Sequence, residues 1–447
     1  MIRLNRPILI RLISLKSILT ILFCTSALIS SAQQELGLAD AIRIGLERNY
    51  QIRVSEKNVE IAENNNSWGL AGRYPLITLG VRQGNRYDNT PQLNGDGRSE
   101  LITNTVTPNI NLNWTLFDGF AVNISKEQLE LLQSFTKGNA SVVVENTIQA
   151  IVLAYYKVLL EQEKLSVLRQ VKNLSRDRFN YQIMKKEIGS SVTYDVLQAE
   201  DAFLSDSTNF LLQQLNLKNA LLNLHLLLAE DAGIAYQLTD TFAFDAPKYQ
   251  LPELMERMTA TNKNLLNQYI NQEILKKEVG LAKSSLYPSL SLNAGADHTN
   301  SRLGYAGQDA AYRNSFDVYA NLSLSFNLSN GGNVRRAIEN AEIEEQIGRL
   351  NIAELEQTLS NLMINYYELY SIQKQLLEVA EVSVESSSLN LEISSDKFKA
   401  GAINSFNYRD VQLTYLNAAI GRLEAIYNLV DTHTELLRLT GGIIEEY

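Results

Sequence analysis

Hydrophobic and polar positions follow two different periods along this chain. Residues 38–73 place apolar side chains at steps of three and four, which is the spacing of an amphipathic helix. After Pro75, apolar and polar residues alternate along 77–82 and again along 110–116, which predicts strands with two unlike faces. From Val144 the helical spacing returns and continues without proline, which predicts a very long helix.

The whole pattern occurs twice, at an offset of about 212 residues. Leu38 to Pro75 aligns without gaps on Leu251 to Pro288, and Tyr155-Tyr156 falls on Tyr366-Tyr367. We therefore predict a tandem duplication. Its parts are a first repeat at 33–230, a linker at 231–250 rich in Gly, Asp and Pro, and a second repeat of the same plan at 251–447.

Each repeat carries two alternating strands whose second face is uniformly polar, separated by polar segments at 84–104 and 297–314 that we expect to be long exposed hairpin loops. A strand of this kind is wetted on one side and lies in an apolar medium on the other. Four strands do not close a barrel, since single-chain outer-membrane barrels have about eight strands at least, and an open edge is not tolerated in lipid. If the strands lie in a membrane, other copies must complete the barrel; two copies would supply eight strands and three would supply twelve.

The long helix of each repeat ends at a glycine turn, near Gly189 and Gly401, from which a helix of roughly 40 residues returns. Residues 333–398 contain no proline and only Gly348, so this helix is expected to be about 100 Å long. An ordinary globular core does not hold such a length, and the sustained spacing is typical of coiled-coil packing.

The first 32 residues have the features of a signal peptide. Four basic residues precede an apolar stretch at 17–29, and Ser30-Ser31-Ala32 supplies the small residues that signal peptidase requires. We therefore expect export, with the mature chain beginning near Gln33. Phe23 precedes Cys24 where a lipoprotein signal needs a small residue, so lipidation is not expected. Beyond this segment no run of 18 uncharged apolar residues occurs.

Charge and composition exclude several classes of protein. The signal removes four of the 40 basic residues and none of the 50 acidic ones, which leaves 36 against 50 and a net charge of −14. Such acidity argues against a nucleic-acid partner. Without Cys24 the mature chain has no disulfide, and its three histidines fall at non-equivalent places in the duplication, so we expect neither a metal nor a cofactor. No nucleophile, P-loop or zinc-protease motif is present, so we do not expect an enzyme.

Short motifs mark the junctions between the predicted elements of both repeats. They are Tyr74-Pro75 and Tyr287-Pro288 before the first strands, Leu116-Phe117-Asp118-Gly119 and Asn330-Gly331-Gly332 where strand hands over to long helix, and the tip turns that begin at Gly189 and Gly401. Residues 189–199, Gly-Ser-Ser-Val-Thr-Tyr-Asp-Val-Leu-Gln-Ala, are the most specific. In their order, spacing and duplication, these motifs make the whole mature chain resemble the outer-membrane efflux family of TolC-like channels.

The resemblance implies a fold class that is mainly α with transmembrane β. Tandem-duplicated helical hairpins would form a trimeric α-barrel in the periplasm, and four strands per protomer would complete a twelve-stranded barrel in the outer membrane of a Gram-negative bacterium. Such homotrimers are the exit ducts of tripartite pumps. Their partners are a periplasmic adaptor (membrane fusion) protein, an inner-membrane transporter of RND or ABC type, and outer-membrane lipid; the family has no cofactor and no catalytic activity.

The resemblance also implies a gate at the periplasmic tip, where the family carries carboxylates six and nine residues after the turn glycine. In this chain those positions are Asp195 and Gln198 in the first repeat, and Asn407 and Asp410 in the second. We hypothesise that Asp195 and Asp410, with Arg409, help to set a closed and negatively charged tip. In the alternative, Asp195 is a helix N-terminal residue that faces water, and Asp410 with Arg409 is a solvated charge pair.

Three other functions are alternatives to an efflux duct. Some members of the family serve type I protein secretion instead. An exported structural coiled-coil protein would need the helices but has no use for lipid-facing strands. A glycan-acting enzyme would need two carboxylates at a fixed separation, which this sequence does not single out.

Overall fold

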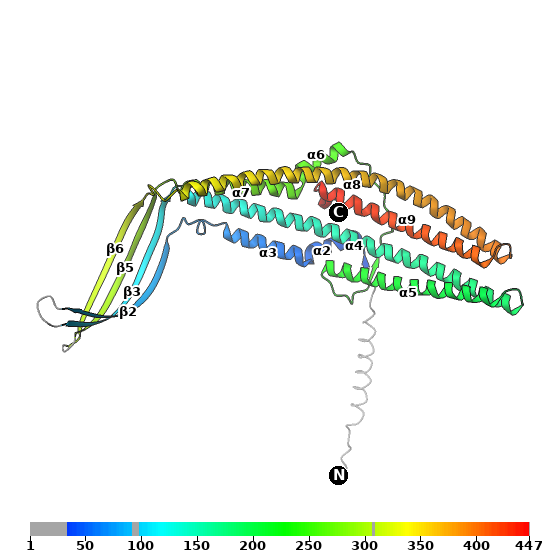
Figure 1. Ribbon diagram of the computed structural model, residues 1–447, viewed down its shortest axis with the longest axis horizontal. Helices are drawn as coiled ribbons and strands as arrows, with labels where there is room; N and C mark the ends of the chain where they lie inside the picture. The colour runs from blue at the N-terminus through cyan, green and yellow to red at the C-terminus, as the bar shows by residue number, and fades with distance from the viewer. Residues whose placement is uncertain (1–33, 92–97, 306–308, 447) are drawn as a thin grey trace, which may run out of the picture. The chain divides into compact units, whose positions relative to one another are not determined.

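The computed structural model describes residues 34–91, 98–305 and 309–446; the predicted signal peptide, with Cys24, lies outside them. One order of elements occurs twice, a helix pair, a strand pair, a long helix and a returning helix (Figure 1), which confirms the tandem duplication. The elements are β1 (Gln34–Leu36), α2 (Leu38–Arg48), α3 (Tyr50–Asn65), β2 (Leu76–Pro91), β3 (Arg98–Asp118), α4 (Ala121–Glu187), α5 (Thr193–Leu228), β4 (Tyr236–Leu238), α6 (Leu251–Thr261), α7 (Lys263–Ser284), β5 (Ser289–Tyr305), β6 (Ala311–Ser325), α8 (Asn333–Lys399), α9 (Ser405–Leu439) and α10 (Ile443–Glu446).

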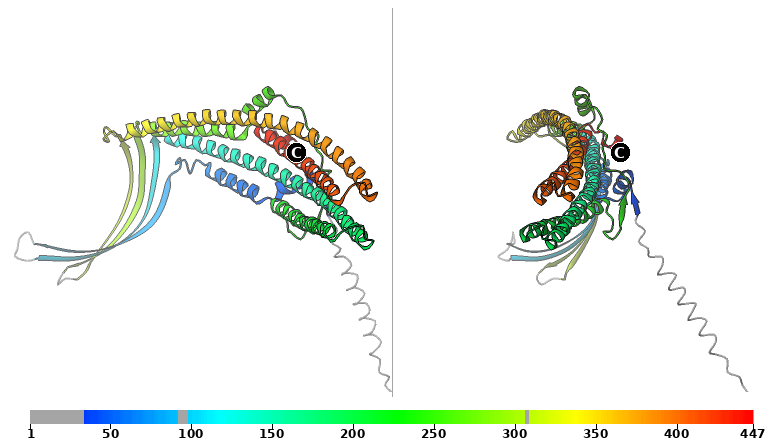
Figure 2. Two further views of the ribbon diagram at one scale, coloured as in Figure 1. Left: turned by 45° about the vertical axis from the view of Figure 1, so that its right-hand side comes forward. Right: turned by 90° about the vertical axis from the view of Figure 1, so that its right-hand side faces the viewer.

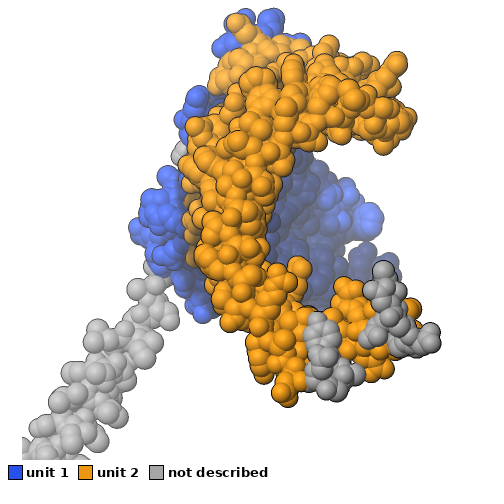
Figure 3. Space-filling view, turned by 90° about the vertical axis from the view of Figure 1, so that its left-hand side faces the viewer, with its two compact units in different colours: residues 1–52, 144–254, 363–447 blue, residues 53–143, 255–362 orange. Residues whose placement is uncertain are grey.

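The chain packs into two compact units, coloured separately in Figure 3. Among the described residues, unit 1 contains 34–52, 144–254 and 363–446, and unit 2 lies within 53–143 and 255–362. Each unit combines parts of both repeats, because α4 and α8 each contribute one portion to each unit. The division at 33–230, 231–250 and 251–447 therefore describes the order of the sequence, and as a domain division it stays a prediction.

Unit 2 contains a four-stranded antiparallel sheet in the order β2-β3-β5-β6, which curves along its length (Figure 2). Leu112 on β3 lies opposite Ile77 on β2 and Ala294 on β5, so the predicted apolar positions share one face. That face is open: Leu79 is 82% exposed and Leu324 is 74% exposed. Sustained exposure of leucine and valine on one sheet face fits contact with lipid and is unfavourable in water.

The strands are longer than the sequence predicted. Residues 84–91 and 98–104 continue the β2–β3 ladder, and most of 297–314 belongs to β5 and β6, so the expected long hairpin loops are largely strand. The Asn- and Gly-rich composition suggested loops because such residues favour turns. Ladder hydrogen bonds join backbone groups whatever the side chains are, and here the polar side chains also pair across strands, as Thr105 does with Ser301 (3.2 Å between hydroxyls).

The predicted helix at 38–73 is interrupted at Asn49, and its counterpart in the second repeat is interrupted at Asn262. The Asn49 Oδ1 accepts the N–H of Gln51 at 2.8 Å, and the Asn262 Oδ1 accepts the N–H of Leu265 at 3.0 Å. Both asparagines are buried and cap the second helix of their pair. The alignment of Asn49 on Asn262 was the sequence feature that marked this break. The helical spacing of apolar residues continues across it and so did not reveal it.

The two long helices have equal length, 67 residues each, as the duplication requires. In unit 1 the apolar stripe of α4 is buried, with Ile151, Tyr155 and Val158 all 0% exposed against α2, α5 and α9. The corresponding stripe of α8 is more open, since Leu376 is 49% and Val379 is 67% exposed. A stretch of α4 has the length and composition of a membrane-spanning helix, but half of it is buried within the protein, as in the core helix of a soluble domain.

A short parallel pair, β1 with β4, was not predicted. It ties the start of the described chain to the linker in unit 1. The Tyr155 hydroxyl donates to the carboxylate of Asp240 (2.6 Å) and lies 2.9 Å from the Leu36 carbonyl oxygen, and burial raises the pKa of this tyrosine well above its usual value. Tyr155 is thus part of the helix packing in unit 1.

Candidate functional site: the helical tip and the strand–helix junctions

The two tip turns have the same backbone geometry. Gly189 has φ +77° and Gly401 has φ +76°, the left-handed conformation in which glycine is favoured. In the first turn the N–H of Ser190 bonds to the Lys185 carbonyl (2.7 Å) and that of Gly189 to Lys186 (3.0 Å). Ala402 and Gly401 repeat this pattern in the second turn. Both long helices therefore end in a Schellman motif, which fixes the return angle of α5 and α9.

The polar residues of the first tip converge on the second. Asp195, half-buried in the first turn of α5, lies 3.3 Å from the Ser191 hydroxyl, which also contacts the Gln182 side chain at 3.0 Å. Asp195 and Gln198 line a cavity of about 360 Å³ together with Asn404 and Phe406 from the second tip. Unit 1 thus brings the two turns side by side, and the role of Asp195 and Gln198 at a gate stays a prediction.

The second tip departs from the expected pairing of its charges. Arg409 forms a two-bond ion pair with Asp206 on α5, at 2.6 and 2.7 Å, while Asp410 is exposed to solvent. The solvated pair of Arg409 with Asp410 that we considered is therefore replaced by a partly buried ion pair between Arg409 and Asp206. Asn407 is exposed, and its N–H donates to the Asn404 side chain at 2.8 Å as a helix cap. Sequence reasoning missed Asp206, because its burial depends on how α5 packs against α9.

The strand-to-helix junctions use glycine with positive φ at the predicted places. Gly119 has φ +70°, Gly331 has +67° and Gly332 has +77°. The carboxylate of Asp118 accepts the N–H of Val122 at 3.1 Å and so caps the start of α4. Phe120 stands where the second repeat has Gly332, and it too adopts a positive φ of 73°.

The tyrosine–proline pairs lie where each first strand begins. β2 starts directly after Pro75, and β5 starts directly after Pro288. Tyr74 and Tyr287 are both mainly exposed, and the ring of Tyr287 meets Phe120 edge-on with centroids 6.1 Å apart. Tyr287 and Phe120 thus pack together at the junction between sheet and helices within unit 2.

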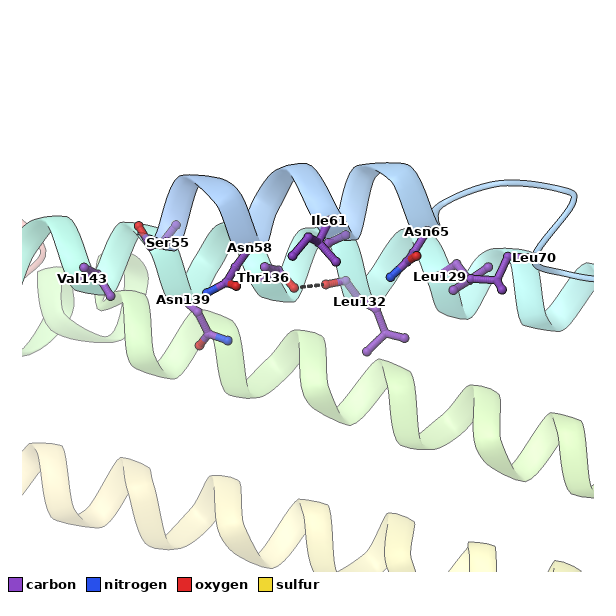
Figure 4. A pocket seen from close by; sticks show the side chains of 12 residues that line it. Ser55, Asn58, Ile61, Asn65, Leu70, Leu129, Leu132, Thr136, Asn139 and Val143 are labelled. Carbon is purple, nitrogen blue, oxygen red and sulfur yellow. Dashed lines mark hydrogen bonds between the residues drawn. The ribbon is translucent and has the colours of Figure 1, made fainter. Parts of the chain in front are cut away.

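A hollow of about 510 Å³ lies between α3 and α4 in unit 2 (Figure 4). Ile61 and Leu132 face it and remain 57% and 39% exposed. No titratable side chain lines it, so it offers a packing surface rather than chemistry. Within the described residues, no group of three or more His, Cys, Asp or Glu side chains is arranged to hold a metal ion.

Long paired helices joined to an open sheet with one apolar face define the protomer of an outer-membrane channel. The chain belongs to the outer membrane efflux protein family, whose model matches residues 41–230 and 254–442. It is also similar to the outer membrane protein TolC of Vibrio cholerae, with 23% identity over 302 residues that span 66% of this chain and 67% of TolC.

Solved channel structures share the fold. The outer-membrane channel OprN matches with a TM-score of 0.73 and 16% identity, covering 91% of this chain and 90% of OprN. The CmeC outer membrane channel of Campylobacter jejuni gives 0.70 and 15%, covering 91% and 85%. MtrE of Neisseria gonorrhoeae, solved in an open state, gives 0.70 and 14%, covering 91% and 89%.

Family membership confirms the predicted location, the outer membrane of a Gram-negative bacterium with a helical tunnel in the periplasm. It also confirms the fold class, mainly α with transmembrane β and tandem-duplicated helical hairpins, to which each chain contributes four strands. The protein is an outer-membrane efflux channel of the TolC type.

Proposed function

We propose that three copies of this chain form the exit duct of a tripartite efflux system that exports small molecules. The open sheet carries the proposal: β2 and β6 are edge strands of a lipid-facing sheet, and such edges need partners in a membrane. Three copies give twelve strands, the number that the TolC resemblance implies. Unit 2 by itself is a curved wall with a hollow side in Figure 3, which supports closure by repetition.

The duplication predicts how neighbouring copies pair. Within one chain, β3 of the first repeat pairs with β5 of the second, with Leu112 opposite Ala294. The alignment of the repeats places Leu112 on Leu324 and Ala294 on Val81. The equivalent contact therefore joins β6 of one copy to β2 of the next, with Leu324 opposite Val81.

The same closure gives the exposed helix faces a partner. α3 leads into β2 and α8 follows β6, so pairing of these edges brings α3 of one copy toward α8 of the next. The hollow between α3 and α4 of one copy then faces three apolar side chains on α8 of the neighbouring copy. These are Ile343, Ile347 and Leu350, which are 52%, 42% and 69% exposed in the single chain. Burial of these side chains would add to the stability of the assembly.

The remaining partners follow from the family. We propose a periplasmic adaptor protein and an inner-membrane transporter of RND or ABC type, with no enzymatic activity in this chain. Deletion of the gene is expected to sensitise cells to small toxic compounds, with rescue by the wild-type gene. Normal resistance combined with loss of a secreted protein would instead favour the second candidate, the duct of a type I secretion system.

The tip carboxylates are proposed to set ion preference. Asp410→Ala, which removes one exposed carboxylate per copy, is expected to lower both cation preference and conductance in single-channel recordings, because a ring of negative charge concentrates cations. Asp396→Ala, at an exposed site late in α8, is the matched control. If Asp410→Ala leaves both quantities at the wild-type values, the assignment of Asp410 to the gate is wrong.

A further inference from the structure

The buried guanidinium group of Arg178, the partly buried one of Arg409 and the buried carboxylate of Asp206 meet where α4, α5 and α9 pack together near the tip. Arg409 forms its ion pair with Asp206, and Arg178 on α4 lies close enough to interact electrostatically with both. Arg178 is 2% exposed, and the side chains of Asp206 and Arg409 are 3% and 16% exposed. The cluster thus holds two positive charges against one negative charge.

The excess positive charge persists at neutral pH. Burial, together with the nearby charge of Arg409, lowers the pKa of Arg178 to about 10. The guanidinium therefore remains protonated at pH 7 and does not relieve the imbalance by losing its proton. A buried charge without a counter-charge is strongly destabilising, so the cluster favours an additional anion.

Several buried polar atoms of α4 and α9 lack a hydrogen-bond partner among the described residues. Arg178 Nη1 donates to the Ser405 carbonyl at 3.1 Å, whereas Nε and Nη2 have no partner within the described ranges. The hydroxyl of Ser405 and the amide of Gln412, also buried, have none either. Ser405, Arg409 and Gln412 are spaced by four and three residues, so they share one face of α9. Ser405 begins this helix, where the helix dipole favours negative charge.

We infer that Arg178, with Ser405 and Gln412, binds a small monovalent anion of the halide class inside each copy of the chain. One negative charge brings the cluster to neutrality, whereas a divalent oxyanion would reverse the imbalance in the same buried place. Since α4 belongs to the first hairpin and α9 to the second, the anion joins the two hairpins beside the tip. The site lies within unit 1 of one chain, so it does not depend on the number of copies in the duct.

Bromide is a direct probe of this site, because its anomalous scattering locates it in crystals of the full-length protein. The expected result is a bromide peak within hydrogen-bonding distance of Nε and Nη2 of Arg178. An ordered water at that position, with no bromide signal, would overturn the inference.

Thermal unfolding of the purified protein supplies a second readout. Replacing gluconate by chloride or bromide at constant ionic strength is expected to raise the unfolding midpoint saturably, by about 2 °C or more. Arg178→Met should abolish the rise. Arg176→Met, the same substitution at an exposed site on the same helix, should preserve it. An equal rise in both variants, or a bromide peak that persists in Arg178→Met, would identify an adventitious ion only and overturn the site.

Gln412→Leu provides the test if Arg178→Met does not accumulate as folded protein. Removing the Gln412 amide is expected to reduce the halide-dependent rise while the protein still folds, because leucine has a similar size and needs no hydrogen-bond partner in this buried position. A rise equal to that of the wild type would count against the site.

Discussion

Asp206→Asn is expected to destabilise unit 1 by about 3–5 kcal/mol, the typical result of removing one partner from a buried ion pair. The substitution leaves Arg409 and Arg178 close together in a buried place without the carboxylate that offsets them. The hairpins α4–α5 and α8–α9 lose their two-bond link beside the tip. The thermal unfolding midpoint of the purified protein should fall, and the conductance of the closed channel should rise.

Two variants make this expectation specific. Asp201→Asn, on an exposed position of the same helix, should leave both quantities near the wild-type values. Arg409→Met should lower the stability of unit 1 less than Asp206→Asn does. In Arg409→Met, Asp206 keeps Arg178 as a nearby positive charge, and the repulsion between the two guanidinium groups disappears. Equal losses of stability in Arg409→Met and Asp206→Asn would contradict the imbalance of two guanidinium groups against one carboxylate.

Gly119→Ala is expected to prevent most of the protein from assembling in the outer membrane. Its φ of +70° costs an L-residue about 1–2 kcal/mol. An added Cβ would also lie 2.3 Å from the Ser284 carbonyl oxygen and 2.8 Å from the Tyr287 Cβ, so the backbone of α7 must shift. Overpacking of this kind adds about 1–3 kcal/mol. The measurement is the amount of folded, heat-modifiable protein in the outer-membrane fraction.

Gly331→Ala is the matched control, since Gly331 occupies the equivalent junction with a φ of +67° but has nothing within 4 Å of an added Cβ. Gly331→Ala should lose only the about 1–2 kcal/mol of stability that a positive φ costs an L-residue. The variant should therefore still assemble. Similar yields of the two variants would show that contact with α7 does not determine the junction.

Much of this fold could be predicted from the sequence because it rests on local periodicity and on duplication. The alternation of apolar and polar residues along 110–116 and the 3-and-4 spacing after Val144 each reflect a single element. Because the pattern occurs twice, the duplication gave the number of strands. The ends of β2 and β3 could not be predicted, since residues 84–91 and 98–104 are held in strands by ladder bonds that polar side chains do not reveal. The β1–β4 pair joins residues about 200 positions apart and has too few residues to show a period.

The candidate site could be predicted only in part. Gly189 and Gly401 stood out because each ends a long helix, and the structure gives both the left-handed conformation. The partner of Arg409 could not be predicted, because Asp206 looks like any other acidic residue of α5 until that helix packs against α9. Arg178 was missed for the same reason, since its burial is a property of three helices together.

Disulfide trapping between copies tests the central claim, that edge strands of separate chains pair to close one barrel. Val81→Cys and Leu324→Cys are introduced together into the chain, whose Cys24 lies in the predicted signal, and oxidised in isolated outer membranes. The expected result is a covalent product of three chains after heating in detergent, which reductant returns to single chains. Val81→Cys with Ser323→Cys, whose side chains point to opposite faces, should not link. Single chains only, a product that stops at two chains, or equal linking in the control pair would show that β6 of one chain does not pair with β2 of the next to close one barrel.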